Sequence, residues 1–387
     1  MNYDKLLSEK VLGLKPSGIR KFFDIAESVA DVISLSVGEP DFKTPWAVRK
    51  RAIDVLEAGR TNYTSNAGLA ELREAVSEYL KRAIRVEYSP ADEIVITVGG
   101  SEAIDLAVRA LVNPGDEVIV PEPGFVCYSP IVRMAGGVPV PAVTREEDCF
   151  KLTPETLESL ITPKTKAMFL PFPNNPTGAV MRRRELEEIA GVVGKTDMAV
   201  ISDEIYSELT YGEPHVSIAE IGDMRERAVV VNGFSKSFAM TGWRLGFAGG
   251  PRRIISQMLK IHQYAVMCSP TISQHAAVTA LNDCGGEVRA MTEEYDARRR
   301  FTVKGFRDLG LGCFEPEGAF YAFPSIKGTG MGSAEFCTRL IKEKKVAVVP
   351  GDAFGECGEG YVRVCYAYSV RHLSAALKRI GEFLGAL

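Results

Sequence analysis

Short runs of β-branched and other apolar residues recur through the first two thirds of the chain, each followed by a stretch with helical periodicity. The helical stretches include ELREAVSEYLKR and RRRELEEIAGVV, in which apolar residues return every three or four positions. Apolar strands that alternate with amphipathic helices are typical of a mostly parallel sheet with helices on both faces. The predicted strands are residues 93–98, 117–123, 137–143, 167–173, 198–204 and 228–234.

After about residue 285 the pattern changes to longer, more charged helices, together with short strands around AFYAFPS, VAVVPG and YVRVCYA. Grouped helices and strands of this kind indicate a separate α+β domain. A chain of 387 residues also exceeds what one hydrophobic core commonly supports. We therefore expect an N-terminal arm at 1–45 that joins the small domain, a large domain at 46–285 and a small α+β domain at 286–387.

Composition narrows the functional classes. Lys and Arg number 46 against 50 for Asp and Glu, a net charge of −4, which argues against a nucleic-acid surface built on positive charge. The N-terminus shows no uninterrupted apolar signal region, and no uncharged apolar span of membrane length is visible. Eight scattered cysteines without a CxxC pair, with four histidines, predict no metal site. We expect a cytoplasmic protein without a nucleic-acid or membrane partner.

Residues suited to chemistry follow directly after the predicted strands, where open parallel sheets bind their ligands. The first strand runs into Gly99-Gly100, and a helix opens with Ser101-Glu102, where free N–H groups favour an anion such as phosphate. A plain tight turn explains the two glycines about as well. The stretch is not GxGxxG, which disfavours a nicotinamide-dependent dehydrogenase.

Three further strand ends carry aromatic or polar side chains. Phe125 and Tyr128 follow a strand, and an aromatic side chain there either stacks on a flat ring or packs in the core. Asn175, held extended by Pro176, can turn its amide toward a ligand, although Asn-Pro turns are common. Asp203 ends an apolar strand, where a carboxylate needs a cation or a proton donor unless it caps the next helix.

The stretch NGFSKSFAMTGWRLGFAGG, residues 232–250, holds two charged residues, Lys236 and Arg244, among small and aromatic residues. We expect both cations to be buried without a carboxylate between them. A dry pocket disfavours the charged form of a lysine and makes it nucleophilic, and an arginine among apolar residues suits phosphate. A phosphate cradle, a stacking aromatic, a carboxylate and a nucleophilic lysine are together what pyridoxal phosphate requires.

In their order along the chain, these motifs resemble those of the class I aminotransferases of fold type I. The resemblance covers nearly the whole chain, through GEPDF, NYTSNAGLAELREAV, PGDEVIVPEPGF, NNPTG, SDEIY, SKSFAMTGWRLG and FGECGEGYVRVCYA. It implies pyridoxal 5′-phosphate as cofactor, a homodimer with shared active sites, and an α/β fold with a mostly parallel seven-stranded sheet, helices on both faces and a smaller α+β domain. Within the family, the chain looks most similar to aminotransferase A, N-acetyl-diaminopimelate aminotransferase and broad aspartate and aromatic aminotransferases.

The resemblance also implies roles for individual residues. Lys236 would form the Schiff base and move a proton, Asp203 would pair with the ring nitrogen, and Phe125 would stack on the ring. Asn175 and Tyr206 would hold the ring 3′-oxygen.

The remaining implied contacts concern the phosphate and the substrate. The residues assigned to the phosphate are Gly100, Ser101, Glu102, Ser235 and Arg244, with Tyr63 reaching the phosphate of the neighbouring subunit. Arg363 would clamp the substrate α-carboxylate with the help of Gly38 and Asn175, and Ile19 and Phe22 would line the side-chain pocket.

The implied reaction is ping-pong transamination between an L-amino acid and a 2-oxo acid, with glutamate and 2-oxoglutarate as one pair. A β-C–S lyase of the same fold remains an alternative, because one fold serves several reactions at Cα. A ligand-sensing regulator would need a fused DNA-binding domain, for which the family pattern leaves no room. The segment QYAVMCSPTIS has no Arg or Lys, which disfavours strict aspartate specificity and favours an apolar or mixed preference.

Overall fold

A seven-stranded sheet forms the centre of the fold. The computed structural model describes all residues except 2, 15, 17 and 19–28. The strand order is β2-β8-β7-β6-β5-β3-β4, and the pairs are parallel except that β8 runs antiparallel to both neighbours. The predicted mostly parallel sheet is therefore confirmed. Its strands are β2 (Ile94–Thr97), β3 (Glu117–Glu122), β4 (Val138–Val143), β5 (Thr165–Leu170), β6 (Ala199–Asp203), β7 (Ala228–Gly233) and β8 (Gly246–Gly249).

Alternating side chains of the central strands enter two different cores. In β5, Ala167 and Phe169 belong to a core cluster with residues of α5, α6 and α9, whereas Met168 and Leu170 belong to the cluster on the other face. Both faces of a parallel sheet are covered in this way, so its strands are apolar throughout. The helices that follow strands or flank the sheet are α3 (Trp46–Glu57), α4 (Ala70–Ile84), α5 (Gly99–Leu111), α6 (Tyr128–Ala135), α7 (Pro154–Leu160), α8 (Arg183–Val193), α9 (Arg252–Ala265) and α10 (Thr271–Asp283).

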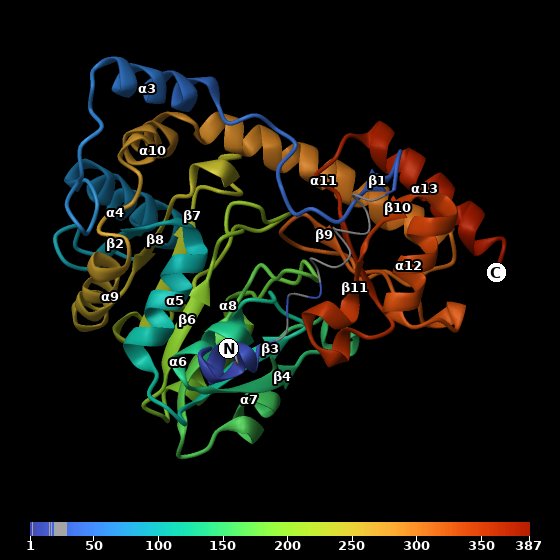
Figure 1. Ribbon diagram of the computed structural model, residues 1–387, viewed down its shortest axis with the longest axis horizontal. Coiled ribbons are helices and arrows are strands. Elements are labelled where there is room, and N and C mark those ends of the chain that lie inside the picture. The colour runs from blue at the N-terminus through green and yellow to red at the C-terminus, as the bar shows by residue number, and fades with distance from the viewer. Residues whose placement is uncertain (2, 15, 17, 19–28) are drawn as a thin grey trace.

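Two small sheets lie apart from the central sheet, at the right of Figure 1. β1 pairs with β10 in parallel, and β9 and β11 flank β12 in an antiparallel sheet. The long helix α11 runs across the molecule between the two regions (Figure 1). These elements are β1 (Ile33–Ser34), β9 (Tyr321–Ala322), β10 (Val346–Ala347), β11 (Val349–Pro350), β12 (Val362–Cys365), α11 (Gly285–Asp308), α12 (Ser333–Lys344) and α13 (Val370–Leu384).

The predicted helix and strand regions agree with these elements, with two differences of detail. Helix α5 begins at Gly99, two residues before the predicted start, and strand β8 was not predicted. The division of the chain at Gly285-Gly286 coincides with the start of α11, and the domain boundaries themselves stay a prediction.

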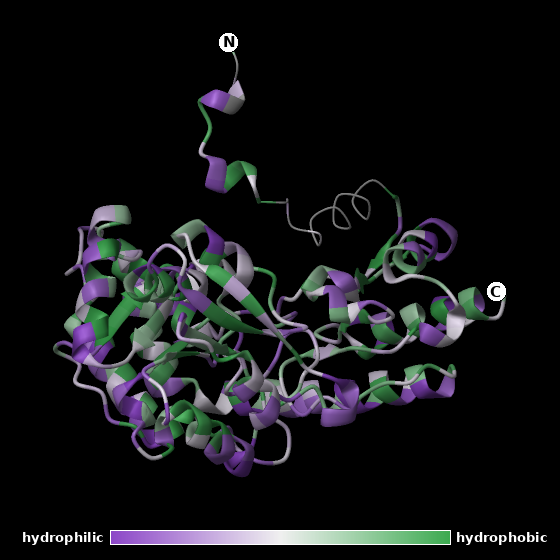
Figure 2. Cartoon of the chain, turned by 90° about the horizontal axis from the view of Figure 1, so that it is seen from below, coloured by the Kyte–Doolittle hydropathy of each residue, from purple (hydrophilic) through white to green (hydrophobic). Residues whose placement is uncertain are grey.

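The N-terminal turns expose apolar side chains. They comprise the turn at Tyr3–Lys5, which projects from the main body in Figure 2, and the short helix α1 (Glu9–Leu12), which lies beside α6. Leu6, Leu7, Val11 and Leu12 are all exposed. Across the part of the chain that the structure describes, no helix combines the length and the apolar character needed to cross a membrane.

Candidate active site

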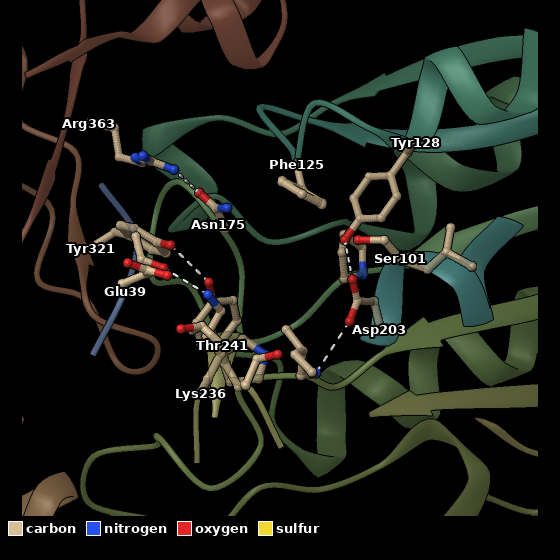
Figure 3. Close-up of a pocket in the computed structure, with 18 of the residues that line it drawn as sticks. Glu39, Ser101, Phe125, Tyr128, Asn175, Asp203, Lys236, Thr241, Tyr321 and Arg363 are labelled. Carbon is tan, nitrogen blue, oxygen red and sulfur yellow. Dashed lines mark hydrogen bonds between the residues drawn. The ribbon is translucent and has the colours of Figure 1, made fainter. Parts of the chain in front are cut away.

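A cavity of about 350 Å³ opens at the carboxyl edge of the central sheet, between the sheet and the smaller sheets (Figure 3). It brings together most of the residues that the sequence singled out, although they come from distant parts of the chain. The predicted site residues that line it are Gly38, Gly100, Ser101, Phe125, Asn175, Asp203, Tyr206, Ser235, Lys236, Arg244 and Arg363.

Lys236 lies three residues beyond the end of β7, and its side chain enters the cavity. Its Nζ donates a hydrogen bond to the carbonyl oxygen of Gly38 over 2.7 Å. Although part of the side chain faces the open cavity, desolvation is the largest cause that lowers the pKa of Lys236, to about 8. Arg363 and Arg244 lower this pKa further, so a sizeable fraction of the amine is neutral near neutral pH.

The lowered pKa of Lys236 predicts how fast the cofactor-free protein captures the aldehyde of pyridoxal phosphate at different pH values. Only the neutral amine attacks a carbonyl, and the Lys236 amine loses its proton as the pH rises through about 8. The capture rate should therefore rise about tenfold per pH unit below this value and level off above it. Stopped-flow absorbance after mixing at a series of pH values measures the rate. A rate that keeps rising to the ordinary lysine value of 10.5 would contradict the prediction.

Asp203 is the last residue of β6 and lies on the side of the cavity opposite Arg363 (Figure 3). The hydroxyl of Tyr128 donates to its Oδ2 over 2.7 Å, and the backbone N–H of Ile205 donates to Oδ1 over 3.3 Å. Burial raises the pKa of Asp203 to about 6, and these two donors oppose the rise. The carboxylate is thus ionised at pH 7 and faces the cavity. Phe125 lines the same side, with its ring edge-to-face against Tyr128.

Arg363 comes from β12 and is 3% exposed. Its Nη1 donates to Oδ1 of Asn175 over 3.0 Å, and its Nη2 donates to the carbonyl oxygen of Ser36. Within the described chain its buried Nε finds no hydrogen-bond partner and no carboxylate pairs with the guanidinium. A buried arginine of this kind is suited to bind an anion from outside the chain.

Tyr206 follows β6 and lines the cavity, and within the described chain its hydroxyl has no charged hydrogen-bond partner. Its hydroxyl is 2.9 Å from the hydroxyl of Tyr321, which was not among the predicted site residues. Burial is the largest cause that raises the pKa of Tyr206 well above its ordinary value. Tyr206 therefore remains a neutral hydroxyl, able to donate a hydrogen bond at the pH at which the protein works.

Arg244 and the start of α5 lie together at one end of the cavity. Gly99 has a φ of +77°, and a Cβ there would lie 2.8 Å from Nη2 of Arg244, so this position requires glycine. Arg244 itself has a left-handed φ of +52°, a costly conformation for a residue with a side chain. Its guanidinium donates to the carbonyl oxygen of Thr241 and is exposed. The prediction that both cations are buried was therefore wrong for Arg244, because this turn directs the residue toward the cavity mouth.

Other predicted residues do not reach the cavity with their side chains. The carboxylate of Glu102 accepts from the backbone N–H of Val98 and lies 2.9 Å from Nδ1 of His262, and Glu102 does not line the cavity. Tyr63 is 81% exposed and does not line the cavity. Ile19 and Phe22 lie outside the described residues.

The sequence analysis missed several residues that line the cavity. These are Tyr321, Glu39 and Thr241. Tyr128 was singled out with Phe125 as an aromatic residue after a predicted strand, but it was given no contact with Asp203. Its hydrogen bond to Asp203 depends on the direction of its side chain, which no spacing rule provides.

Comparison with known proteins assigns the family. The sequence pattern described as "Aminotransferase class I and II" matches residues 30–380. The chain is 46% identical to an aspartate aminotransferase of Pyrococcus abyssi and 44% identical to aromatic-amino-acid aminotransferase 2 of Thermococcus litoralis, in each case over 98% of both proteins.

Comparison with solved structures leads to the same family. A crystal structure of an aromatic aminotransferase from Pyrococcus horikoshii superposes with a TM-score of 0.91 at 45% identity, covering 94% of this chain and 99% of that one. The predicted resemblance is therefore confirmed. The chain belongs to the class I and II aminotransferases and is an enzyme that uses pyridoxal phosphate.

Proposed function

We propose that the cavity binds pyridoxal phosphate with its phosphate at Arg244 and the start of α5 and its ring between Phe125 and Asp203. The residues present fit this group. A helix N-terminus and an arginine without a carboxylate partner in the described chain suit a phosphate, and an ionised carboxylate suits a protonated ring nitrogen. Backbone at Gly100 and Ser101, with the side chain of Ser235, would complete the phosphate contacts.

The observation that carries the proposal is that three chemically distinct groups meet in one cavity: the amine of Lys236, the carboxylate of Asp203 and the unpaired guanidinium of Arg363. When bound, pyridoxal phosphate supplies an electron-withdrawing ring that makes the Cα proton of an amino acid acidic. Asp203 would keep the proton on the ring nitrogen. Lys236 would take the proton from Cα, and Tyr206 and Asn175 would donate hydrogen bonds to the ring oxygen.

Arg363 would bind the α-carboxylate of the amino acid and so orient Cα toward Lys236. Nη1 and Nη2 each use only one of their two N–H groups, on Asn175 and Ser36, so Nε and the second N–H of an Nη group remain for this contact. The planar guanidinium favours two parallel hydrogen bonds, which a lysine cannot make. Gly38, whose carbonyl oxygen accepts from Lys236, would assist from its backbone beside the bound carboxylate.

We propose that the substrates are an L-amino acid and a 2-oxo acid, with glutamate and 2-oxoglutarate as one pair, and that the amino acid is apolar, aromatic or of mixed character. Among the described residues, the cations that line the cavity are Lys236, Arg244 and Arg363, and each has a role other than binding a second carboxylate. The relatives named for aspartate and for aromatic amino acids support a broad preference.

We propose that two copies of the chain form a homodimer that shares its active sites. Tyr63 is 81% exposed and Tyr264 is 86% exposed. Hydrogen bonds from Asn66 to Met267 and from Thr271 to Asn62 hold the loop of Tyr63 beside the end of α9. These exposed aromatic residues suit an interface from which Tyr63 reaches the phosphate of the partner.

The experiment that tests the proposed reaction follows the visible absorbance of the purified protein. We expect single amino acids to convert the cofactor to its amine form and 2-oxoglutarate to restore it. The amino acid that reacts fastest identifies the donor. Pyruvate and ammonia released from cysteine conjugates without this conversion would favour the β-C–S lyase, and the absence of any band after addition of pyridoxal phosphate would exclude both reactions.

A further inference from the structure

Tyr321 lines the cavity and contacts both Tyr206 and Arg363, and the proposed reaction gives it no role. It begins β9, is 2% exposed, and has its hydroxyl 2.9 Å from that of Tyr206. The centre of its ring lies 4.5 Å from the guanidinium carbon of Arg363. Figure 3 shows Tyr321 and Arg363 on the same side of the cavity, away from Asp203.

The hydrogen bond between the two tyrosines has a favoured direction. The cation of Arg363 against the ring stabilises the charged form of Tyr321 and makes its hydroxyl the stronger acid of the pair. Burial raises the pKa of both hydroxyls, and Arg363 is the largest influence opposing this rise at Tyr321 but a lesser one at Tyr206. The stronger acid is the better donor. Tyr321 therefore donates to Tyr206, and the proton of Tyr206 is free to point into the cavity.

The backbone of Gly38 fixes the position of the Tyr321 hydroxyl. A Cβ on Gly38 would lie 2.0 Å from this oxygen, so only glycine lets the tyrosine reach Tyr206. The carbonyl oxygen of the same glycine accepts the hydrogen bond from Lys236. The Tyr321 hydroxyl thus lies next to the backbone that holds Lys236, and the ring of the same residue lies against Arg363.

We propose that Tyr321 is a positioning residue that couples substrate binding at Arg363 to the Lys236 nitrogen through Tyr206, an inference that rests on the proposed function. Donation from Tyr321 strengthens the donation of Tyr206 to the cofactor oxygen, because hydrogen bonds in a chain polarise one another. A substrate carboxylate neutralises Arg363, and both donations then weaken. While Lys236 is bonded to the cofactor, its nitrogen would then become more basic and would accept a proton from the substrate ammonium group, which leaves the substrate amine neutral and able to attack.

Other groups also act on Lys236 and remain when the Tyr321 hydroxyl is removed. The charged and titratable groups that influence its amine are Cys365, Glu39, Arg363 and Arg244. Asn175, which accepts from Nη1 of Arg363, is a second link between the arginine and the cofactor. Removal of the Tyr321 hydroxyl should therefore reduce the coupling without abolishing it.

The test is Tyr321→Phe, which keeps the ring against Arg363 and removes the hydroxyl. The readout is the pH at the midpoint of the visible absorption change of the holoenzyme, with and without saturating 3-phenylpropionate, a carboxylate that has no amino group. When 3-phenylpropionate is absent, we expect the midpoint of Tyr321→Phe to lie about 0.5 to 1 pH unit above that of the wild type. This is the size expected for the loss of one hydrogen bond. The further rise caused by the carboxylate should be smaller than in the wild type. We expect kcat to fall by about 3- to 10-fold and KM to stay within about 2-fold, because Arg363 is intact.

Tyr366→Phe is the matched control. This tyrosine is also fully buried, and its hydroxyl contacts the hydroxyl of Tyr211 and the carbonyl oxygen of Ala319 outside the cavity. We expect its midpoint to equal that of the wild type. We also expect Tyr206→Phe combined with Tyr321→Phe to shift the midpoint no more than Tyr206→Phe alone, because Tyr321 acts through Tyr206.

The outcomes separate the coupling from the proposed function. Three results would each overturn the coupling: an unchanged midpoint in Tyr321→Phe, an equal shift in Tyr366→Phe, or additive shifts in the double variant. In each case the visible absorption band of the wild type would still support the proposed function. A wild-type protein that binds no pyridoxal phosphate would overturn both.

Discussion

Replacing Lys236 by alanine is expected to lower the rate of amino-group transfer by about 10⁴-fold, the upper part of the range for a positioned proton-transfer group. The variant lacks the amine that enters the cavity beside Gly38 with a pKa lowered to about 8. Tyr206 and Asp203 remain, but neither is a neutral amine placed to take the Cα proton. Single-turnover absorbance measurements with the preferred amino acid would give the rate.

A surface lysine variant serves as the control for Lys236→Ala, and an added amine serves to restore its activity. Lys195→Ala removes an exposed amine that pairs with Glu158 on the surface, and we expect it to react like the wild type. A small amine such as methylamine should partly restore the reaction of Lys236→Ala, because it can occupy the space of the missing side chain. Transfer at the wild-type rate in Lys236→Ala would show that another group moves the proton.

Replacing Asp203 by asparagine is expected to lower the rate of transfer by about 10²- to 10³-fold, the effect of removing one well-placed electrostatic partner from a water-excluded site. The amide has nearly the same shape but no charge, so it cannot keep the ring nitrogen of the cofactor protonated. Burial and the hydrogen bond from Tyr128 hold this carboxylate in place, and its pKa of about 6 leaves it ionised at pH 7. The same single-turnover measurement applies.

Asp203→Glu serves as the conservative comparison, because it keeps the negative charge at a slightly different position. We expect it to lose less activity than Asp203→Asn. The affinity for pyridoxal phosphate, measured by equilibrium dialysis, should fall in the asparagine variant, because a buried charge pair has lost one partner. Equal activity in Asp203→Asn and the wild type would remove the ring-nitrogen role from Asp203.

The central sheet could be predicted because its strands are apolar on both faces. Met168 and Phe169 point to opposite cores, and both had to be hydrophobic. Strand β8 escaped prediction because it is short and begins and ends with glycine, Gly246 and Gly249, which resemble a turn in sequence. Its pairing with β2 and β7 comes from the tertiary structure.

The candidate site could be predicted where residues lie at a strand end or shortly after it, as Asp203 and Lys236 do, since those ends share one edge of the sheet. Tyr321 could not be predicted in this way. It comes from one of the small sheets, and its contact with Tyr206 depends on how β9 packs against the central region. The exposure of Arg244 was also out of reach, because the left-handed turn that directs it is a feature of backbone geometry.

The most direct test of the account is to reduce the holoenzyme with sodium borohydride and locate the modified residue by peptide mass spectrometry. The account predicts that pyridoxal phosphate becomes fixed to Lys236, the lysine that lines the cavity with Asp203 and Arg363. Attachment to any other lysine, or no attachment in a protein that binds the cofactor, would contradict the assignment on which the proposed function rests.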